Sequence, residues 1–325
     1  LRGLGARVIE LPSASLLDLP RVWRLARFLR REKVELLHAH LRYANVLGAL
    51  AGRLAGVPMV ASLRSAGNYH GRYHAIRKGI ETLALRYAAN CVMANGYAVA
   101  EAHKARLGRK PIHVVQNAIE PPPHVSPGER LRLRAELGVS PQQLLLISVG
   151  RLTTPKGYFD LLDAFATVHA THPETVLTIV GGGGIRAELS ARIAQLGLQE
   201  QARLLGPRDE VRTLLAAADV YVSASLWEGM PVAVMEAMAA GLPVVATAVG
   251  EVPRLLQNGN GVLVAPRQPA GLARALTALL SDAARQRALG AAARAYAARE
   301  FGVEKWVTRM HAMYAELLAQ KTAQN

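Results

Sequence analysis

Two cationic side chains, Arg151 and Lys156, stand in the turn Gly150-Arg-Leu-Thr-Thr-Pro-Lys-Gly157, directly after the apolar run LLLISV. A helix is predicted to begin at Tyr158, so both cations lie beside the positive end of its dipole. Such a site favours an anion, and a diphosphate is the natural occupant. The turn is not a Walker A loop, because the glycine spacing and the Lys-Ser/Thr pair of that motif are missing. A solvated basic loop explains the turn equally well when it is taken alone.

Two carboxylates, Glu228 and Glu236, flank a second turn in the stretch SLWEGMPVAVMEAMAAGLPVVAT. A buried strand is predicted before this turn, and a helix is predicted over residues 232–240 after it. Glu236 lies among apolar residues of that helix, and a carboxylate in such surroundings needs a partner, for example a ligand hydroxyl. The spacing alone is equally compatible with a solvated helical glutamate and a loop glutamate.

A four-glycine run, Gly181–Gly184, closes the strand LTIV and opens a helix. Glycine lets backbone N–H groups approach a ligand closely. The run is weak evidence by itself, because many glycine-rich turns are only tight turns.

The elements that would hold these turns alternate between strand and helix, which indicates an α/β fold with a parallel sheet in each half. In the first half, strands are predicted at Arg7 to Leu11, Leu36 to His40, Pro58 to Leu63, Cys91 to Asn95 and His113 to Gln116, and helices at Pro20 to Glu32 and Tyr43 to Ala55. In the second half, strands are predicted at LLLISVG, LTIV, ARLLG, DVYVSAS, LPVVAT and GVLVA.

The chain is therefore predicted to form two tandem Rossmann-like, doubly wound domains. We expect a first domain over residues 1–138, a second over residues 139–302, and a final helix over residues 303–325 that crosses back to the first domain. A proline-rich break, Pro121 to Pro127, marks the linker. The opening LRGLGARVIE looks like a helix end followed by a second strand, so we expect an initial strand, loop and helix to be absent from this chain.

The amino-acid composition limits the classes of partner that we expect. A net charge of +15 favours anionic ligands, but the nine Tyr, four Phe and three Trp residues are not interleaved with basic residues, so we expect no nucleic acid. The lone cysteine, Cys91, excludes a disulfide framework within the chain and favours the cytoplasm. No run of about 18 apolar residues is present.

The helix predicted over residues 21–33 groups Arg24, Arg27, Arg30 and Arg31 against apolar residues. Two interpretations stay open. The helix could lie on an anionic membrane, making the protein peripheral on the inner face of the membrane. Alternatively it covers the sheet with a solvated basic face, which is the favoured interpretation because core-facing helices show the same pattern.

Taken in order, the segments GRLTTPKG, IVGGGG, LLGPRDEV, EGMPVAVME and NGNGVLV resemble the carboxy-terminal donor domain of the retaining glycosyltransferases of family GT4, which have the GT-B fold. The resemblance is strong over residues 140–270 and looser elsewhere, through LLHAHLRYANVLGALAGRLAGVP and HVVQNAIE. Five elements in the same order are far more specific than any one of them.

The resemblance implies a role for each matching residue. Arg151 and Lys156 would hold the donor diphosphate and stabilise the leaving group, Glu228 would contact the transferred sugar, and Glu236 would accept hydrogen bonds from the ribose. The other residues implied in donor binding are Gly150, Gly183, Arg208, Val211, Gly229, Met230, Pro231 and Val232, with residues 207–211 near the nucleobase. No Asp-x-Asp sequence is present, so we expect a metal-independent enzyme without a cofactor, in which the two cations offset the charge of the leaving group.

On the acceptor side, the resemblance places His40 and Asn117 at the border of the cleft. The histidine that the family usually carries after the strand VPMVASL is replaced by Arg64, with His70 and His74 a few residues on. The loop that usually reads Gly-Gly before a glutamate reads Gly250-Glu-Val-Pro-Arg254.

We therefore expect a retaining glycosyltransferase that moves a sugar from a UDP- or GDP-sugar to a hydroxyl of a glycan or lipid-linked acceptor, in polysaccharide or glycolipid synthesis at the cell surface. A single carboxylate facing the sugar suits front-face transfer better than double displacement. Two alternatives remain: a nucleotide-sugar-binding module without turnover, and a sugar-nucleotide epimerase or phosphorylase of the same fold.

Overall fold

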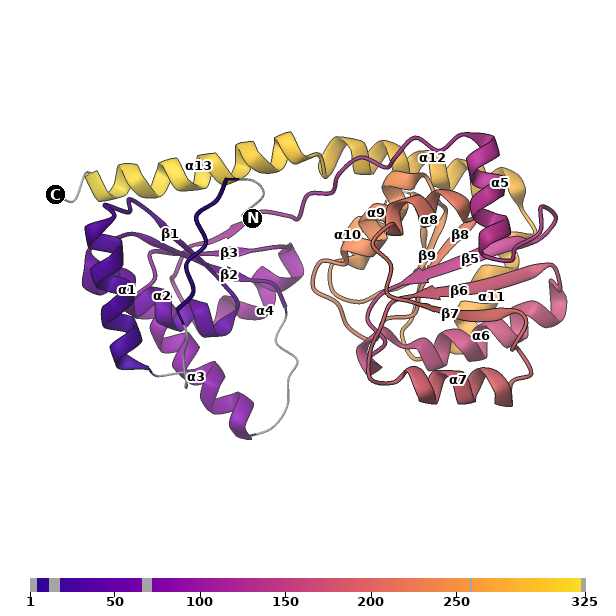
Figure 1. The fold of residues 1–325 in the computed structure, drawn as a ribbon, viewed down its shortest axis with the longest axis horizontal. Helices are drawn as coiled ribbons and strands as arrows, with labels where there is room; N and C mark the ends of the chain where they lie inside the picture. The colour runs from indigo at the N-terminus through magenta and orange to yellow at the C-terminus, as the bar shows by residue number, and fades with distance from the viewer. Residues whose placement is uncertain (1–4, 12–17, 66–71, 258, 323–325) are drawn as a thin grey trace. The chain divides into compact units, whose positions relative to one another are not determined.

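The computed structural model describes residues 5–11, 18–65, 72–257 and 259–322 (Figure 1). His70 lies outside the described residues, as does the side chain of His74. The chain forms two compact units: one contains the residues up to Val115 together with those from Thr308 onward, and the other spans Gln116–Val307. Each unit is an α/β fold around a parallel sheet, which confirms the predicted fold class.

The sheet of the first unit has the order β1-β2-β3-β4, and all its pairs are parallel. Its strands are β1 (Leu37–His40), β2 (Met59–Leu63), β3 (Cys91–Ala94) and β4 (Ile112–Val114). Its helices are α1 (Leu19–Arg31), α2 (Arg42–Ala55), α3 (Arg72–Tyr87) and α4 (Tyr97–Leu107). The four strands and helices α1 and α2 agree with the predicted segments to within a few residues.

The strand predicted at Arg7 to Leu11 is wrong. These residues form no strand, and β1 is an edge of the described sheet. Val8 and Ile9 are exposed, so their apolar side chains have no packed surface against which an extended segment could be held.

The sheet of the second unit has the order β10-β9-β8-β5-β6-β7, and all six strands were predicted. They are β5 (Leu144–Val149), β6 (Thr175–Val180), β7 (Ala202–Gly206), β8 (Val220–Ser223), β9 (Val244–Thr247) and β10 (Val262–Val264). The chain builds outward from β5 through β6 to β7, then returns to the other side of β5 to lay down β8. Since loops diverge where the strand order reverses, the β5/β8 boundary is the topological switch point.

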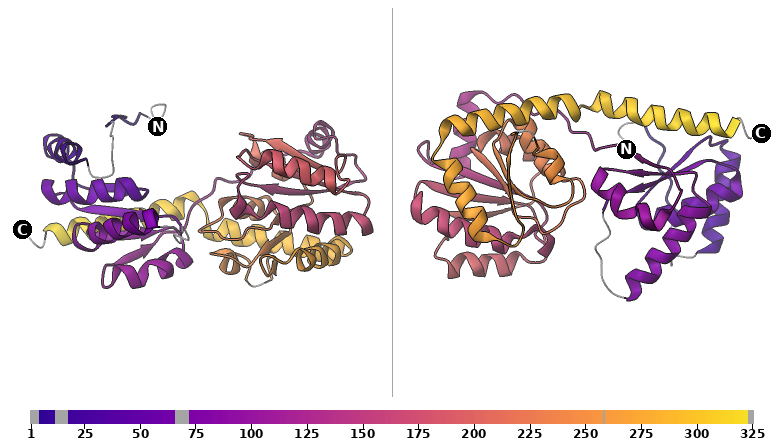
Figure 2. Two further views of the ribbon diagram at one scale, coloured as in Figure 1. Left: turned by 90° about the horizontal axis from the view of Figure 1, so that it is seen from below. Right: turned by 180° about the vertical axis from the view of Figure 1, so that it is seen from behind.

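Helices cover both faces of this sheet, as Figure 2 shows. They are α5 (Pro127–Glu136), α6 (Tyr158–Thr171), α7 (Arg186–Gln195), α8 (Val211–Ala217), α9 (Val232–Ala240), α10 (Val252–Leu255), α11 (Pro269–Leu280) and α12 (Ala283–Glu300). Alternate residues of β5 serve two cores: Leu145 and Ile147 join one apolar cluster and Leu146 joins the other. A central strand that is apolar on both sides is typical of such a sheet.

The last helix, α13 (Val303–Thr322), begins in the second unit, and its residues from Thr308 onward belong to the first. Tyr314 of α13 lies with its hydroxyl 2.6 Å from Nδ1 of His38 on β1. The other ring nitrogen of His38 lies 2.7 Å from Oγ of Ser62 on β2. Burial, followed by nearby His40 and Arg64, lowers the pKa of His38 to about 4, so this histidine bridges helix and sheet in its neutral form at neutral pH.

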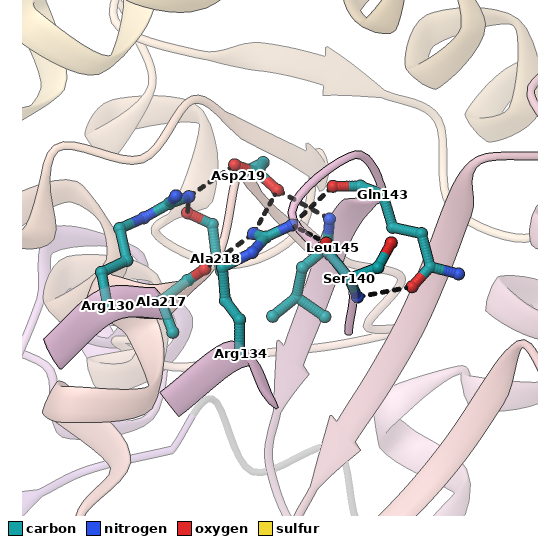
Figure 3. Close-up of polar contacts among 8 residues, drawn as sticks. All are labelled: Arg130, Arg134, Ser140, Gln143, Leu145, Ala217, Ala218 and Asp219. Carbon is teal, nitrogen blue, oxygen red and sulfur yellow. Dashed lines mark hydrogen bonds and ion pairs between the residues drawn. The ribbon is translucent and has the colours of Figure 1, made fainter. Parts of the chain in front are cut away.

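Helix α5, which the sequence pattern did not indicate, is fixed to the sheet by a buried guanidinium (Figure 3). Arg134 is 2% exposed and donates to Asp219 Oδ2 over 2.8 Å. It also donates to the backbone carbonyls of Ala217, Ser140 and Gln143. Asp219 in turn accepts from the backbone N–H of Leu145, at the start of β5. One side chain thus connects α5, the start of the central strand and the turn before β8.

Replacing Arg134 with alanine is expected to lower the free energy of unfolding of the second unit by roughly 3 to 5 kcal/mol, because buried carbonyls and part of a carboxylate lose their donors. Arg132 of the same helix has a 71% exposed side chain, and Arg132→Ala should change stability by no more than about 0.5 kcal/mol. Urea unfolding followed by circular dichroism tests both variants. Equal stability of the two would contradict the structural role of Arg134.

Candidate functional site

The predicted cation turn and the predicted carboxylate turn meet at the switch point of the second unit. Lys156 follows β5 and Glu228 follows β8, and these strands are neighbours in the sheet. Lys156 Nζ donates to Glu228 Oε1 over 2.6 Å, and the two side chains are 23% and 12% exposed. Loops that follow adjacent parallel strands on opposite sides of a reversal leave a crevice in which ligands bind. The ion pair therefore lies where the topology predicts a ligand crevice.

The turn that carries Lys156 is a short 3-10 helix, η2 (Thr154–Lys156), closed by Gly157. Gly157 has a φ of 62°, and a Cβ there would lie 2.0 Å from the carbonyl oxygen of Ala224. The backbone N–H of Leu226 donates to the carbonyl of Pro155 over 2.8 Å. Only glycine allows this approach, so the β5 and β8 loops are locked together at the backbone.

A third loop supports Glu228 from the other side. Gly250, after β9, has a φ of 55°, and a Cβ there would lie 2.3 Å from the carbonyl oxygen of Glu228. The backbone N–H of Glu251 donates to the carbonyl of Gly229 over 3.1 Å. The close packing of the backbone against Glu228 therefore requires a glycine at position 250. This glycine stands in the loop whose sequence departs from the family pattern.

Ser225 is a site residue that the sequence reasoning missed. Its hydroxyl donates to Glu228 Oε1 over 2.7 Å, and its carbonyl accepts from the hydroxyl of Thr247 over 2.5 Å. The signal that could have found it is its position three residues before Glu228, within reach across a turn. Glu228 Oε1 thus has a hydroxyl donor and an ammonium donor at once, which fixes the orientation of the carboxylate.

Two buried tyrosines, Tyr158 and Tyr221, lie near the carboxylate of the ion pair. Burial is the main cause that raises the pKa of Tyr158 and of Tyr221, and the nearby Glu228 carboxylate adds to both. The Tyr158 hydroxyl is buried, and a Cβ on Gly150 would lie 3.0 Å from it. Apolar walls with neutral phenols strengthen the electrostatic interactions of the Lys156–Glu228 pair by excluding water.

Arg151, the second predicted cation, is exposed. Within the described part of the chain its guanidinium has no hydrogen bond and no ion pair, and its carbonyl accepts from the backbone N–H of Thr153. The structure thus keeps Arg151 on the same loop as Lys156, with its side chain open to solvent and available to an anion.

The glycine run packs against the cation loop, and its role in donor binding stays a prediction. A Cβ on Gly183 would lie 2.2 Å from the carbonyl oxygen of Leu152, and one on Gly181 would lie 2.0 Å from that of Gly150. The backbone N–H of Leu152 donates to the carbonyl of Gly182 over 2.8 Å. The close approach that these glycines permit is made to the cation loop itself, so the β6 loop buttresses the β5 loop.

Glu236 lies in a separate charged group. Burial raises its pKa, with Arg212 opposing the shift and Glu120 adding to it. Arg212 pairs with Glu120 over 2.7 Å and donates to the carbonyl of Pro121 over 3.2 Å. The sequence reasoning missed Arg212, although it directly follows the predicted residue Val211. A carboxylate beside one shared cation still has oxygen lone pairs to offer to ligand hydroxyls.

Of the remaining predicted donor residues, some follow β7 and others follow β8. Met230 and Pro231 are buried under the start of α9, whereas Val232 is 39% exposed. Arg208 is exposed and lies 3.8 Å from Glu210, a separation typical of a weak surface pair. Arg208 is therefore free to move toward a ligand at the β7 loop.

The predicted acceptor-side residues fall in both units. His40 ends β1 and Arg64 follows β2, the adjacent strand, and both are exposed. Burial, followed by the nearby Arg64, lowers the pKa of His40. Leu41, directly after His40, has φ 74° and ψ 153°, a strained conformation for a residue with a side chain. Asn117 belongs to the second unit.

No group of three or more His, Cys, Asp or Glu side chains in the described part of the chain could hold a metal ion. A search of the same residues for a helix both long and apolar enough to cross a membrane finds none.

Comparison with known families gives two matches that together span most of the chain. Residues 129–296 match the model of "Glycosyl transferases group 1", and residues 2–121 match that of "Glycosyltransferase Family 4". The first match contains the Lys156–Glu228 pair and Glu236.

Individual relatives carry related names. The chain is 33% identical over 304 residues to "D-inositol 3-phosphate glycosyltransferase 1" of Catenulispora acidiphila, covering 86% of this chain and 72% of that protein. It is 28% identical to the "UDP-Gal:alpha-D-GlcNAc-diphosphoundecaprenol alpha-1,3-galactosyltransferase" of Escherichia coli, over 76% of this chain and 64% of that protein. Among solved structures, Anabaena Alr3699/HepE in complex with UDP is similar with a TM-score of 0.84 at 26% identity, covering 94% of this chain and 84% of that one.

The raised pKa of Glu236 yields a stability prediction. Above the pKa of an unfolded glutamate, folding must keep this carboxylate charged where burial disfavours the charge, so Glu236→Gln should stabilise the second unit at pH 7. This stabilisation should shrink as the pH falls from the raised pKa of folded Glu236 to the ordinary pKa of an unfolded glutamate. Below the ordinary pKa the carboxyl group is neutral in both the folded and the unfolded state. Urea unfolding at several pH values measures this.

The exposed Glu188 of α7 provides the control, because Glu188→Gln removes a charge of the same unit without removing a buried one. If Glu236→Gln destabilised the unit at pH 7, attraction between Glu236 and Arg212 would outweigh the cost of burying the carboxylate, and the prediction would be wrong.

Proposed function

The chain belongs to the glycosyl transferases of group 1 and so transfers sugar from nucleotide-sugar donors, and we propose that it does so with retention, onto a hydroxyl of a glycan or lipid-linked acceptor. The observation that carries the proposal is the Lys156–Glu228 pair at the switch point between β5 and β8. In this pair a cation donates a hydrogen bond directly to a carboxylate, which supports a site for a diphosphate and a sugar.

The cations have a clear task in such a reaction. When the bond between the sugar and the diphosphate breaks, the electron pair moves to a phosphate oxygen, where negative charge develops. Lys156 and Arg151 would offset that charge, and the buried surroundings of Lys156 make the interaction stronger than it would be in water. The start of α6 lies on the same loop and adds the positive end of its dipole.

Glu228 would orient the sugar and would not form a covalent bond to it. Its Oε1 already accepts from both Lys156 and Ser225, and a carboxylate oxygen held by two donors is a weaker nucleophile. This favours front-face transfer, in which the acceptor oxygen arrives on the side from which the diphosphate leaves. Retention then follows without a glycosyl-enzyme intermediate.

The donor nucleotide would lie along the β7 and α9 side of the crevice. Glu236 would accept hydrogen bonds from the ribose hydroxyls, with Arg208 and Val211 near the base. We propose UDP as the leading nucleotide, ahead of GDP. Support comes from the Anabaena structure, which contains UDP at 26% identity to this chain, and from the UDP-Gal in the name of the Escherichia coli relative.

For the acceptor, we propose a hydroxyl in the synthesis of cell-surface glycans or glycolipids, reached from the cytoplasm. The diphosphoundecaprenol in the name of the Escherichia coli relative supports a lipid-linked acceptor. The net charge of +15 also suits an acceptor that carries phosphate. His40 and Arg64, which end adjacent strands of the first unit, would form part of the acceptor side.

Replacing Lys156 with alanine should lower kcat for sugar transfer by about 10²- to 10³-fold, because a preorganised donor to the leaving group is lost. Lys104→Ala removes an exposed lysine whose side chain is 72% accessible and should leave kcat unchanged. Release of nucleoside diphosphate from a panel of UDP- and GDP-sugars with glycan and lipid-linked acceptors measures both variants. If the wild-type chain bound nucleotide but transferred no sugar to any acceptor, the result would contradict the proposed activity and favour a binding module.

The stereochemical part has its own test. The anomeric proton of the first-formed product, observed by NMR, should show the same configuration as the donor. An inverted product would overturn front-face transfer while leaving the transferase activity intact. A modified nucleotide sugar in place of a new glycosidic bond would favour the epimerase alternative.

A further inference from the structure

The outer face of α3 is apolar although it is turned away from the core of the first unit. Ile76, Leu83 and Tyr87 are 58%, 60% and 72% exposed. They recur along α3 with the spacing of a single helical stripe. The exposed residues beside them on the helix are Ala75, Gly79 and Arg86. We refer to these six residues as the outer face of α3.

The opposite face of the same helix is buried in the core of the first unit. Glu81, Ala84 and Leu85 are buried, and Ala84 and Leu85 belong to the apolar core of the unit. A helix that covers a sheet normally turns a polar face to solvent, so the apolar residues opposite this core need another explanation. Figure 1 shows α3 on the outside of its unit.

The exposed charge of α3 is positive, which favours an anionic partner. Its only acidic residue, Glu81, is 3% exposed and pairs with Arg42 and Arg106 at 3.5 and 3.2 Å. Arg77 and Lys78 flank the outer face. Arg86 lies on it, and its guanidinium donates to the backbone carbonyls of Arg106 and Ala105. The helix therefore offers apolar side chains and positive charge to its surroundings, with its negative charge neutralised inside.

Helix α1 adds positive charge to the same unit, and the apolar residues of its inner side are buried. Its apolar residues Val22, Ala26 and Leu29 are buried in a cluster with α2, so this side of α1 packs on a neighbouring helix. Arg24, Arg27, Arg30 and Arg31 are exposed, together with Trp23, which is 62% exposed. Helix α2 packs against both α1 and α3.

We propose that the outer face of α3 contacts the surface of an anionic lipid bilayer, with Ile76, Leu83 and Tyr87 in the interface and the basic residues of α3 and α1 at the headgroups. Interfacial helices bind through this combination of apolar area and cationic charge. The inference deepens the proposed function by naming the surface at which a lipid-linked acceptor would be met, but it rests on the first unit alone.

The test uses flotation of the full chain with vesicles of phosphatidylcholine, with and without phosphatidylglycerol. The wild-type chain should bind the anionic vesicles, and added salt should weaken the binding. The double substitution Ile76→Ser with Leu83→Ser should lower the partition coefficient at least about tenfold, since two large apolar side chains leave the interface. Leu131, 53% exposed on α5 of the second unit, provides the matched control, and Leu131→Ser should bind as the wild type does.

Folding and oligomeric state provide further controls. Because the substituted side chains are exposed, the double variant should keep its circular dichroism spectrum and its thermal transition. Wild-type binding unaffected by the double substitution, or no wild-type binding to anionic vesicles, would overturn the proposal. So would a dimer in analytical ultracentrifugation that the double substitution abolishes, because a second copy would then cover this face. Transfer to a water-soluble acceptor is assayed separately, so loss of vesicle binding and loss of catalysis are distinguishable.

Discussion

The second unit is organised around one ion pair, Lys156 with Glu228, held where the strand order reverses. Neither side chain would be stable in this place alone, since a lone charge so little exposed to water is costly. As a pair, the two charges compensate each other and can lie beside the two tyrosines and the apolar strand ends. The remaining features of the site, which are the loop packing, the serine donor and the short 3-10 turn, serve to bring these two charges to one position.

That position depends on backbone contact between loops. The β5, β6, β8 and β9 loops approach one another so closely that a Cβ at Gly157, Gly183 or Gly250 would overlap a neighbouring carbonyl. Backbone hydrogen bonds, such as that from Leu226 to Pro155, close the gaps. A site assembled in this way is preorganised, because its geometry does not wait for a ligand. Far from the crevice, Arg134 fixes the start of β5, the strand from which the cation loop emerges.

The sequence predicts the strands of both sheets well, because strands that are apolar on two faces leave a clear pattern. The order of the motifs selects Arg151, Lys156, Glu228 and Glu236, of which the structure brings Lys156 and Glu228 together, while their roles stay predictions. Other features depend on distances between segments remote in the chain. Arg212 meets Glu120 across 92 residues of sequence, and Arg134 meets Asp219 across 85. The wrongly predicted strand at Arg7 to Leu11 has the same origin. The alternation of apolar and polar residues does not reveal whether an extended segment pairs with another strand.

The two glutamates differ because their surroundings differ. Glu228 has a permanent cation and a hydroxyl, whereas Glu236 shares Arg212 with Glu120 and its pKa is raised. A diphosphate in the crevice would compete with Glu228 for Lys156, since one ammonium has only three N–H groups to distribute. The more Lys156 turns to the phosphate, the more of the Glu228 carboxylate becomes available to sugar hydroxyls. In the proposed reaction, arrival of the diphosphate and capture of the sugar are therefore linked through one shared cation.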